Sequence, residues 1–219
     1  MTNVGTIDSR VLDILLRAGS SWVLYLLLGL SFAAVAVMLE RLWFFVQERR
    51  PGEALDDALA ALRSKGAAEA LAKLKGLRSM EAAVARACLA HAADGPAAVE
   101  ERKEGAIERE RARYEKRLAF LGTLGNNAPF VGLLGTVLGV IRAFHDLGAS
   151  AGQGPEVVMQ GISEALVATA VGILVALPCV AAFNYIKKRI KDILVDADRF
   201  GHQLIAVLLL SKQGRRAGD

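Results

Sequence analysis

Three long stretches of this chain contain no charged residue, and that absence sets its class. Residues 22–39, 118–141 and 165–186 lack Asp, Glu, His, Lys and Arg, although charged residues are dense between them. A charge in hydrocarbon costs about 2.5–3.5 kcal/mol on insertion scales, and about 18 apolar residues cross a hydrocarbon layer ~30 Å thick. This partition predicts an all-α integral membrane protein with three transmembrane helices.

Cysteine and histidine are scarce, which disfavours several kinds of site. Cys88 lies in a charged region and Cys179 in an apolar one, so we expect no disulfide between them, and neither has metal-ligand neighbours. The three histidines, His91, His145 and His202, lie outside the apolar stretches. The stretches contain no Asp pair, Ser–His arrangement or metal-binding His motif, which argues against an intramembrane enzyme. We predict no metal and no cofactor.

Basic residues indicate the orientation of the chain. The connection 142–164 contains a single Lys or Arg, whereas clusters of them follow the first and third stretches and precede the second. The positive-inside rule then places 47–117 and the C-terminus in the cytoplasm, and the modest net charge of +4 gives no reason to expect nucleic acid. The expected organisation is an outward-facing amphipathic segment (1–20), transmembrane helix 1 (21–46), a cytoplasmic helical domain (47–117), transmembrane helix 2 (118–142), a short outward connection (143–163), transmembrane helix 3 (164–186) and a cytoplasmic C-terminal helix and tail (187–219).

The cytoplasmic regions are predicted to be helical. Residues 53–93 are rich in Ala and Leu, which favour helix, and Gly95-Pro96 should end that stretch. A charged helix over 97–117 is expected to continue without a break into the second span, its charges forming a solvated face. Opposite charges recur on it at i,i+3 spacing in Glu100–Lys103, Glu108–Arg111 and Glu110–Arg113. After the third span, one apolar stripe comprises Ile190, Ile193, Leu194, Ala197, Phe200, Leu204 and Leu208.

The second and third spans each have a stripe of small residues and one proline. Small residues let helix backbones approach closely in lipid, where the hydrophobic effect between helices is missing. Pro129 and Pro178 each leave a backbone carbonyl without its usual partner, which predicts a kink or, alternatively, a wet cavity. The stripes are Gly125, Ala128, Gly132, Gly135 and Gly139 in the second span, and Gly161, Ala165, Ala168, Gly172 and Ala176 in the third.

Two threonines are expected at the same depth in these antiparallel helices. Thr136 lies six residues before Arg142, and Thr169 lies five residues after Glu164, which gives depths of roughly 9 and 7.5 Å at about 1.5 Å per residue. A lone threonine in a span usually bonds a carbonyl of its own helix. Two at matched depth favour a polar ring in an oligomer. Proton transfer through a span generally needs a protonatable group, so either the chain transports nothing or a partner supplies the acid that these spans lack.

The sequence of the second and third spans resembles a known family. Residues 127–141, Asn-Ala-Pro-Phe-Val-Gly-Leu-Leu-Gly-Thr-Val-Leu-Gly-Val-Ile, are similar to the second-span signature of the MotA/TolQ/ExbB proton-channel family. Residues 161–178, followed by Asn184, resemble its third-span signature, and the ExbB/TolQ branch is the most similar. Three positions depart from the pattern: Leu138 stands where many members have tryptophan, and Asn126-Asn127 where Ser, Thr or Ala is common.

The resemblance implies a homopentamer in the bacterial inner (plasma) membrane, with a periplasmic N-terminus and a cytoplasmic C-terminus. Its pore would enclose two copies of a single-span ExbD/TolR-like partner whose transmembrane aspartate faces Thr136 and Thr169, and Glu164 would match the acidic residue at the third-span entrance. The powered process would need a further partner, such as a TonB/TolA-like or gliding component. The candidate site comprises the proton pathway (Thr136, Thr169, Glu164), the packing and kink residues (Gly132, Gly135, Gly139, Pro129, Ala165, Gly172, Pro178) and the inner-mouth polar residues (Asn127, Asn184).

Two functions of different classes fit these residues. In the first, protons driven by the proton-motive force pass the partner's aspartate and the threonines, and the complex does mechanical work. In the second, the chain is a membrane scaffold that passes no ions, since small-residue stripes and spans without acids suit it equally well. Proton flux in the complex separates the two.

Overall fold

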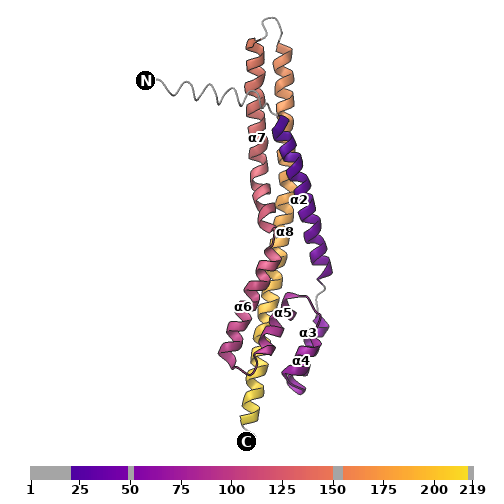
Figure 1. Cartoon of the computed structure of the whole chain (residues 1–219), viewed down its shortest axis with the longest axis vertical. Helices are drawn as coiled ribbons and strands as arrows, with labels where there is room; N and C mark the ends of the chain where they lie inside the picture. The colour runs from indigo at the N-terminus through magenta and orange to yellow at the C-terminus, as the bar shows by residue number, and fades with distance from the viewer. Residues whose placement is uncertain (1–20, 49–51, 150–154, 217–219) are drawn as a thin grey trace, which may run out of the picture. The chain divides into compact units, whose positions relative to one another are not determined.

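The computed structural model describes residues 21–48, 52–149 and 155–216, and all regular structure in those ranges is helical (Figure 1). The predicted N-terminal amphipathic segment, 1–20, lies outside the described residues, as does part of the connection 143–163. The all-α class is therefore confirmed for the described part of the chain. Its helices are α2 (Ser21–Gln47), α3 (Gly52–Ser64), α4 (Ala67–Lys73), α5 (Met80–Ala90), α6 (Pro96–Glu115), α7 (Leu118–Ala149) and α8 (Pro155–Arg216).

Three of these helices contain segments long and apolar enough to cross a membrane. The segments are Ser21–Gln47, Leu118–Gly148 and Val158–Leu210. At about 1.5 Å per residue, the 62 residues of α8 far exceed the ~20 that cross hydrocarbon, so most of the polar C-terminal part of α8 must extend beyond it. Large apolar side chains such as Phe32, which is 77% exposed, cover the outer surface of α2 and require lipid or another protein around them.

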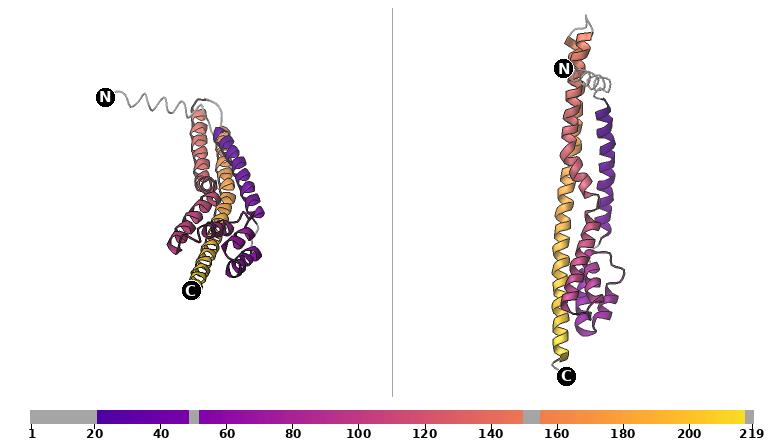
Figure 2. Two further views of the ribbon diagram at one scale, coloured as in Figure 1. Left: turned by 60° about the horizontal axis from the view of Figure 1, so that its bottom comes forward. Right: turned by 60° about the vertical axis from the view of Figure 1, so that its left-hand side comes forward.

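The chain divides into two compact units. The first contains the described residues up to Leu39 together with Arg117–Asn184. The second contains Glu40–Lys116 and the rest of the chain from Tyr185 onward. In the first unit, α7 and the N-terminal part of α8 lie side by side and antiparallel in all three views (Figures 1 and 2). The side chain of Val23, from α2, is fully buried in this unit.

Glycines divide the second unit into short helices. The stretch 53–93, predicted only as helix-favouring, forms three helices, separated at Gly66 (φ 96°) and Gly76 (φ 87°). These are left-handed conformations that glycine adopts without a Cβ penalty. The predicted break at Gly95-Pro96 is confirmed, because α6 begins at Pro96, where a missing N–H costs nothing.

The predicted continuous helix from 97 through the second span is wrong. Helix α6 ends at Glu115, Lys116 is extended (φ −50°, ψ 132°), and Arg117 has φ 61°. A left-handed conformation costs a non-glycine residue roughly 1–2 kcal/mol, so packing elsewhere in the chain must stabilise it. No glycine or proline marks this break, and local sequence signals therefore miss it.

The predicted apolar stripe after the third span forms much of the core of the second unit. Ala197 and Leu204 are fully buried, and Ile190, Ile193 and Phe200 are at most 7% exposed. Tyr114 and Met80, from α6 and α5, are also fully buried in this unit. The short helices pack on the stripe because burying its apolar side chains removes them from water, which is favourable.

Candidate functional site

The two small-residue stripes of α7 and α8 face each other within the chain. All five members of the α7 stripe are buried, as are four of the five in α8. A Cβ on Gly125 would lie 2.7 Å from Val180, and one on Gly161 would lie 2.7 Å from the Ala143 side chain. The stripes therefore build the α7–α8 pair itself, and they give no separate argument for contacts between copies.

The backbones come closest at Gly132 and Gly172. A Cβ on Gly132 would lie 2.7 Å from the Ala168 carbonyl oxygen and 2.9 Å from Thr169 Cα. A Cβ on Gly172 would lie 2.6 Å from the Ala128 carbonyl oxygen and 3.1 Å from Gly132 Cα. Because the neighbours are backbone atoms, no side chain can move aside to make room. These two glycines set the spacing of α7 and α8.

The close packing brings Thr136 and Thr169 together. The Thr169 hydroxyl donates to Thr136 Oγ1 at 3.5 Å, and the Thr136 hydroxyl donates to the Leu133 carbonyl at 2.7 Å. Thr136 thus makes the within-helix bond expected of a lone threonine and also accepts from α8. Both side chains are half-buried. The pair forms a short hydroxyl chain beside the glycine contact, with no titratable group of its own.

The prolines and the remaining packing residues lie on the same two helices as this pair. Pro129 and Pro178 lie inside helices that continue through them. Pro178 is exposed and Pro129 is half-buried. Gly135 would meet Ala168 at 2.7 Å and Val23 at 3.1 Å if it carried a Cβ, so α2 also packs here. Gly139 and Ala165 are buried along the same seam.

The predicted polar residues at the ends of the spans are separate from the threonine pair. Glu164 is exposed and accepts a hydrogen bond from Gln160 Nε2 at 3.3 Å. Asn127 is exposed and donates to the Thr123 carbonyl at 2.7 Å, and Asn184 is exposed on α8. The chain thus brings Thr136 and Thr169 into contact and leaves Glu164, Asn127 and Asn184 free to face lipid, water or a partner.

Lys103 is a buried charge that sequence reasoning missed. Its side chain is 2% exposed, and its Nζ contacts Glu100 Oε1 at 2.6 Å and Asp198 Oδ1 at 2.9 Å. Burial alone would lower the pKa of Lys103, but the hydrogen bonds to Glu100 and Asp198 outweigh it and raise that pKa. The i,i+3 spacing from Glu100 predicted one contact. Nothing in the sequence indicated Asp198, 95 residues away, so Lys103 was assigned to a solvated face.

Glu48 and Tyr114 were also missed. The Tyr114 hydroxyl donates to Glu48 Oε1, and Arg113 Nη2 donates to the same oxygen at 3.1 Å. The Glu48 side chain is 9% exposed. Burial is the largest influence on this carboxyl and raises its pKa from 4.5 to about 7, although Arg113 opposes the shift. The sequence hints at this contact only through Tyr114, an aromatic residue within an otherwise highly charged helix.

A known protein family matches the part of the chain that holds the threonine pair. The family model described as the MotA/TolQ/ExbB proton channel family matches residues 74–199, which is more than half of the chain. A biopolymer transport protein ExbB of Xanthomonas campestris pv. campestris is 39% identical over 99 residues, covering 45% of this chain and 39% of that protein.

Two further relatives have the same name. An ExbB of Neisseria gonorrhoeae is 39% identical over 100 residues, covering 46% of each chain. One of Helicobacter pylori is 44% identical over 84 residues, covering 38% of this chain and 57% of that protein. The match thus spans well under two thirds of each relative. The family model, the glycine-packed helices and these relatives agree, and the chain belongs to the MotA/TolQ/ExbB proton channel family as an ExbB-like member.

Proposed function

We propose that this chain is the proton-channel subunit of an inner-membrane motor, acting with an ExbD/TolR-like partner. Five copies would form the channel, and two copies of a single-span partner would supply the transmembrane aspartate. The N-terminus would lie in the periplasm, and the C-terminus in the cytoplasm. The powered process would be TonB-type uptake, Tol-type envelope maintenance or a gliding or surface machine.

The hydroxyl pair of Thr136 and Thr169 is the observation that carries this proposal. The two side chains come from different helices, meet at 3.5 Å and remain half-buried rather than enclosed. They can solvate a carboxylate brought to them, because a hydroxyl donates to an ionised acid more strongly than to a neutral group. They cannot bind or release a proton at ordinary pH by themselves.

A proton cycle then follows from the chemistry of the partner's acid. Protonation neutralises the aspartate and lowers its cost against an apolar wall such as that formed by Leu133, which is 53% exposed. Ionisation draws the carboxylate back toward the hydroxyls of Thr136 and Thr169. A proton crossing about 150 mV releases roughly 3.5 kcal/mol, which is enough to drive one mechanical step. Two partner helices in a five-fold ring cannot make all contacts at once, and relative rotation is the expected result.

Native mass spectrometry of the complex, gently extracted from source membranes, tests this assignment. Five copies of the chain with two of a small single-span protein bearing an intramembrane aspartate is the expected composition. Any third component would identify the powered process. A monomer or dimer without such a partner would contradict the channel and favour the scaffold function.

A further inference from the structure

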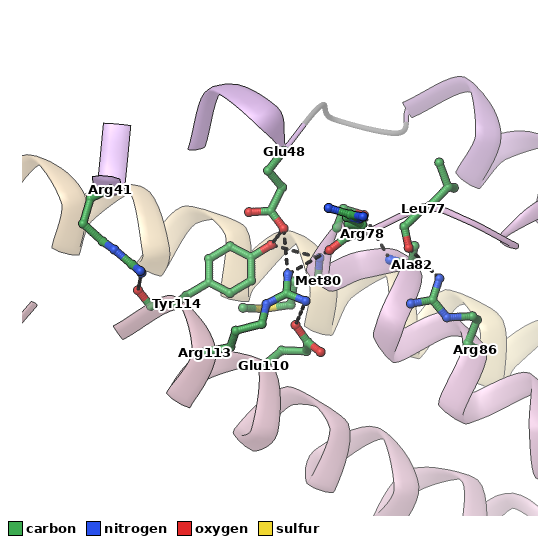
Figure 3. A network of polar contacts seen from close by, with 11 residues as sticks. Arg41, Glu48, Leu77, Arg78, Met80, Ala82, Arg86, Glu110, Arg113 and Tyr114 are labelled. Carbon is green, nitrogen blue, oxygen red and sulfur yellow. Dashed lines mark hydrogen bonds and ion pairs between the residues drawn. The ribbon is translucent and has the colours of Figure 1, made fainter. Parts of the chain in front are cut away.

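The residue that directly follows the first candidate span is tied to two helices of the second unit. Helix α2 ends at Gln47, and the Glu48 carboxyl lies among residues of α5 and α6 (Figure 3). Its Oε1 accepts hydrogen bonds from the Tyr114 hydroxyl and from Arg113 Nη2. Arg113 also donates to the Arg78 carbonyl at 2.8 Å and pairs with Glu110 at 3.1 Å. One carboxyl oxygen thus connects the end of α2 to the end of α6.

The Tyr114 hydroxyl extends this connection to α5. The Met80 backbone N–H, the first of α5, donates to Tyr114 Oη at 3.1 Å. Because the tyrosine proton points at Glu48, the oxygen presents a lone pair to Met80. Ser79 caps the same helix start by accepting from the Ala82 N–H at 3.3 Å. The start of α5 therefore has two caps, and one of them depends on Glu48.

The second carboxyl oxygen of Glu48 has no such support. Glu48 Oε2 is buried and has no hydrogen-bond partner among the described residues. Glu48 borders a cavity of about 10 Å³ that Ser79, Glu81, Tyr114 and Arg189 help to line, which is space for at most one water. Burial makes an ionised carboxylate costly when one of its oxygens has no protein donor, and the neutral acid avoids most of that cost because it carries no charge.

The charges around Glu48 come from three helices and act in opposite directions. Arg113 stabilises the ionised form, while Glu81 from α5 and Glu110 from α6 disfavour it, and Arg189 from α8 lines the cavity. Arg113 is 42% exposed, so solvent screens its attraction, and Glu110 shares it. Burial outweighs the arginine and raises the pKa of Glu48 to about 7. The acid is then about 90% neutral at pH 6 and about 10% neutral at pH 8.

We propose that Glu48 is a proton-operated latch, which holds the end of α2 against α5 and α6 when neutral and releases it when ionised. The neutral acid keeps its bond from Tyr114, carries no charge that needs a donor at Oε2, and leaves Arg113 with Glu110 and the Arg78 carbonyl. The ionised acid is drawn toward bulk water, and the Tyr114 hydroxyl then no longer has a fixed acceptor. In the proposed orientation the latch reads cytoplasmic pH.

Amide hydrogen exchange at Met80 tests the latch in the full-length protein in lipid nanodiscs. Opening exposes an acid with an ordinary pKa of 4.5, so the opening equilibrium should rise about tenfold from pH 6 to pH 8, after correction for intrinsic exchange. Glu48→Gln, which stays neutral, should remove this rise. The matched variant Glu104→Gln, an exposed glutamate of α6, should retain it. A wild-type protein without the rise, or a Glu48→Gln protein that retains it, would overturn the proposal.

Infrared spectroscopy of the wild type gives a test that does not depend on the folding of a variant. A protonated-carboxyl C=O band that disappears with a midpoint near pH 7 is expected. If no carboxyl titrates between about pH 6 and 8, Glu48 ionises as an ordinary glutamate and no latch exists. The band's loss in Glu48→Gln and persistence in Glu104→Gln would assign it to Glu48.

Discussion

The two units of this chain hold their helices together by different means. In the first, α7 and α8 meet so closely that a methyl added at Gly132 or Gly172 would collide with backbone, and a side-chain hydrogen bond joins Thr169 to Thr136. In the second, the helices pack on the apolar stripe of α8, and polar contacts join them as well, including those of the 2%-exposed Lys103 and the Glu48–Tyr114 contact. In lipid, close backbone contact is a main source of helix association, because the hydrophobic effect between helices is missing there. Charges are costly to bury, so those of the second unit are paired with opposite charges.

The largest effect should come from filling the glycine contact. Gly132→Val places a branched side chain where even a Cβ would lie 2.7 Å from the Ala168 carbonyl oxygen, and we expect a loss of about 3 kcal/mol in the free energy of unfolding. Gly29→Val is the matched control, because a Cβ there meets nothing within 4 Å. Thermal unfolding in detergent measures both. Equal stability of the two variants would refute the glycine-spaced seam.

Removing the buried cation of the second unit should have the next largest effect. Lys103→Met removes the lysine that pairs with Asp198 and Glu100, and we expect a loss of about 2 kcal/mol, less than for a fully enclosed pair because both acids are partly exposed. Arg111→Met removes an exposed cation that pairs with Glu115 at 3.0 Å and should leave stability unchanged. Denaturant unfolding compares the variants. If the two variants lose the same free energy of unfolding, burial of the Lys103 ion pairs contributes nothing to stability.

A smaller effect should appear as pH dependence of stability. The pKa of Glu48 is about 7 in the folded chain, against 4.5 for an ordinary glutamate, so its contribution is fully present below pH 4.5 and is lost as pH rises through 7. Relative to Glu48→Gln, the wild type should lose about 1.3 kcal/mol between pH 6 and pH 8, or roughly 3 °C in Tm. Calorimetry at both pH values measures it. Parallel Tm changes in the two proteins would contradict this sign.

The smallest effect should come from the cap of α5. Ser79→Ala removes the acceptor for the Ala82 N–H but leaves Tyr114 to cap Met80, so we expect a loss of about 0.5 kcal/mol. The double variant with Tyr114→Phe should cost more than the sum of the single variants, since both caps serve one helix start. A double-mutant cycle in urea supplies the measurement, and strict additivity would show that the caps are independent.

Features that depend on composition or spacing along one helix could be predicted from the sequence. The three apolar helices follow from stretches that lack charge, and they are present at Ser21–Gln47, Leu118–Gly148 and Val158–Leu210. The depths expected for Thr136 and Thr169 agree with hydroxyls 3.5 Å apart, because antiparallel helices share one rise per residue. The small-residue stripes predicted close packing, though not that their partner is the other helix of the same chain.

Features that depend on distant partners could not be predicted. Whether Lys103 is solvated or buried is decided by Asp198 and Gly201 on α8, which pack against it in three dimensions. Likewise, burial among α5 and α6 raises the pKa of Glu48, and the residues next to Glu48 in the sequence do not indicate that burial. At the break, Arg117 adopts a conformation that arginine disfavours, so residue preferences along the chain could not indicate it.

Proton flux through reconstituted complexes tests the central claim most directly. The chain would be co-expressed with its single-span partner as wild type, Thr169→Ser and Thr169→Val, and native mass spectrometry would verify equal assembly. Ser retains the hydroxyl that meets Thr136, whereas Val keeps the shape and removes it. We predict flux in the wild type and Thr169→Ser, and none in Thr169→Val. Undiminished flux in Thr169→Val would contradict the role of the threonine pair, and no flux in the wild-type complex would leave the scaffold function.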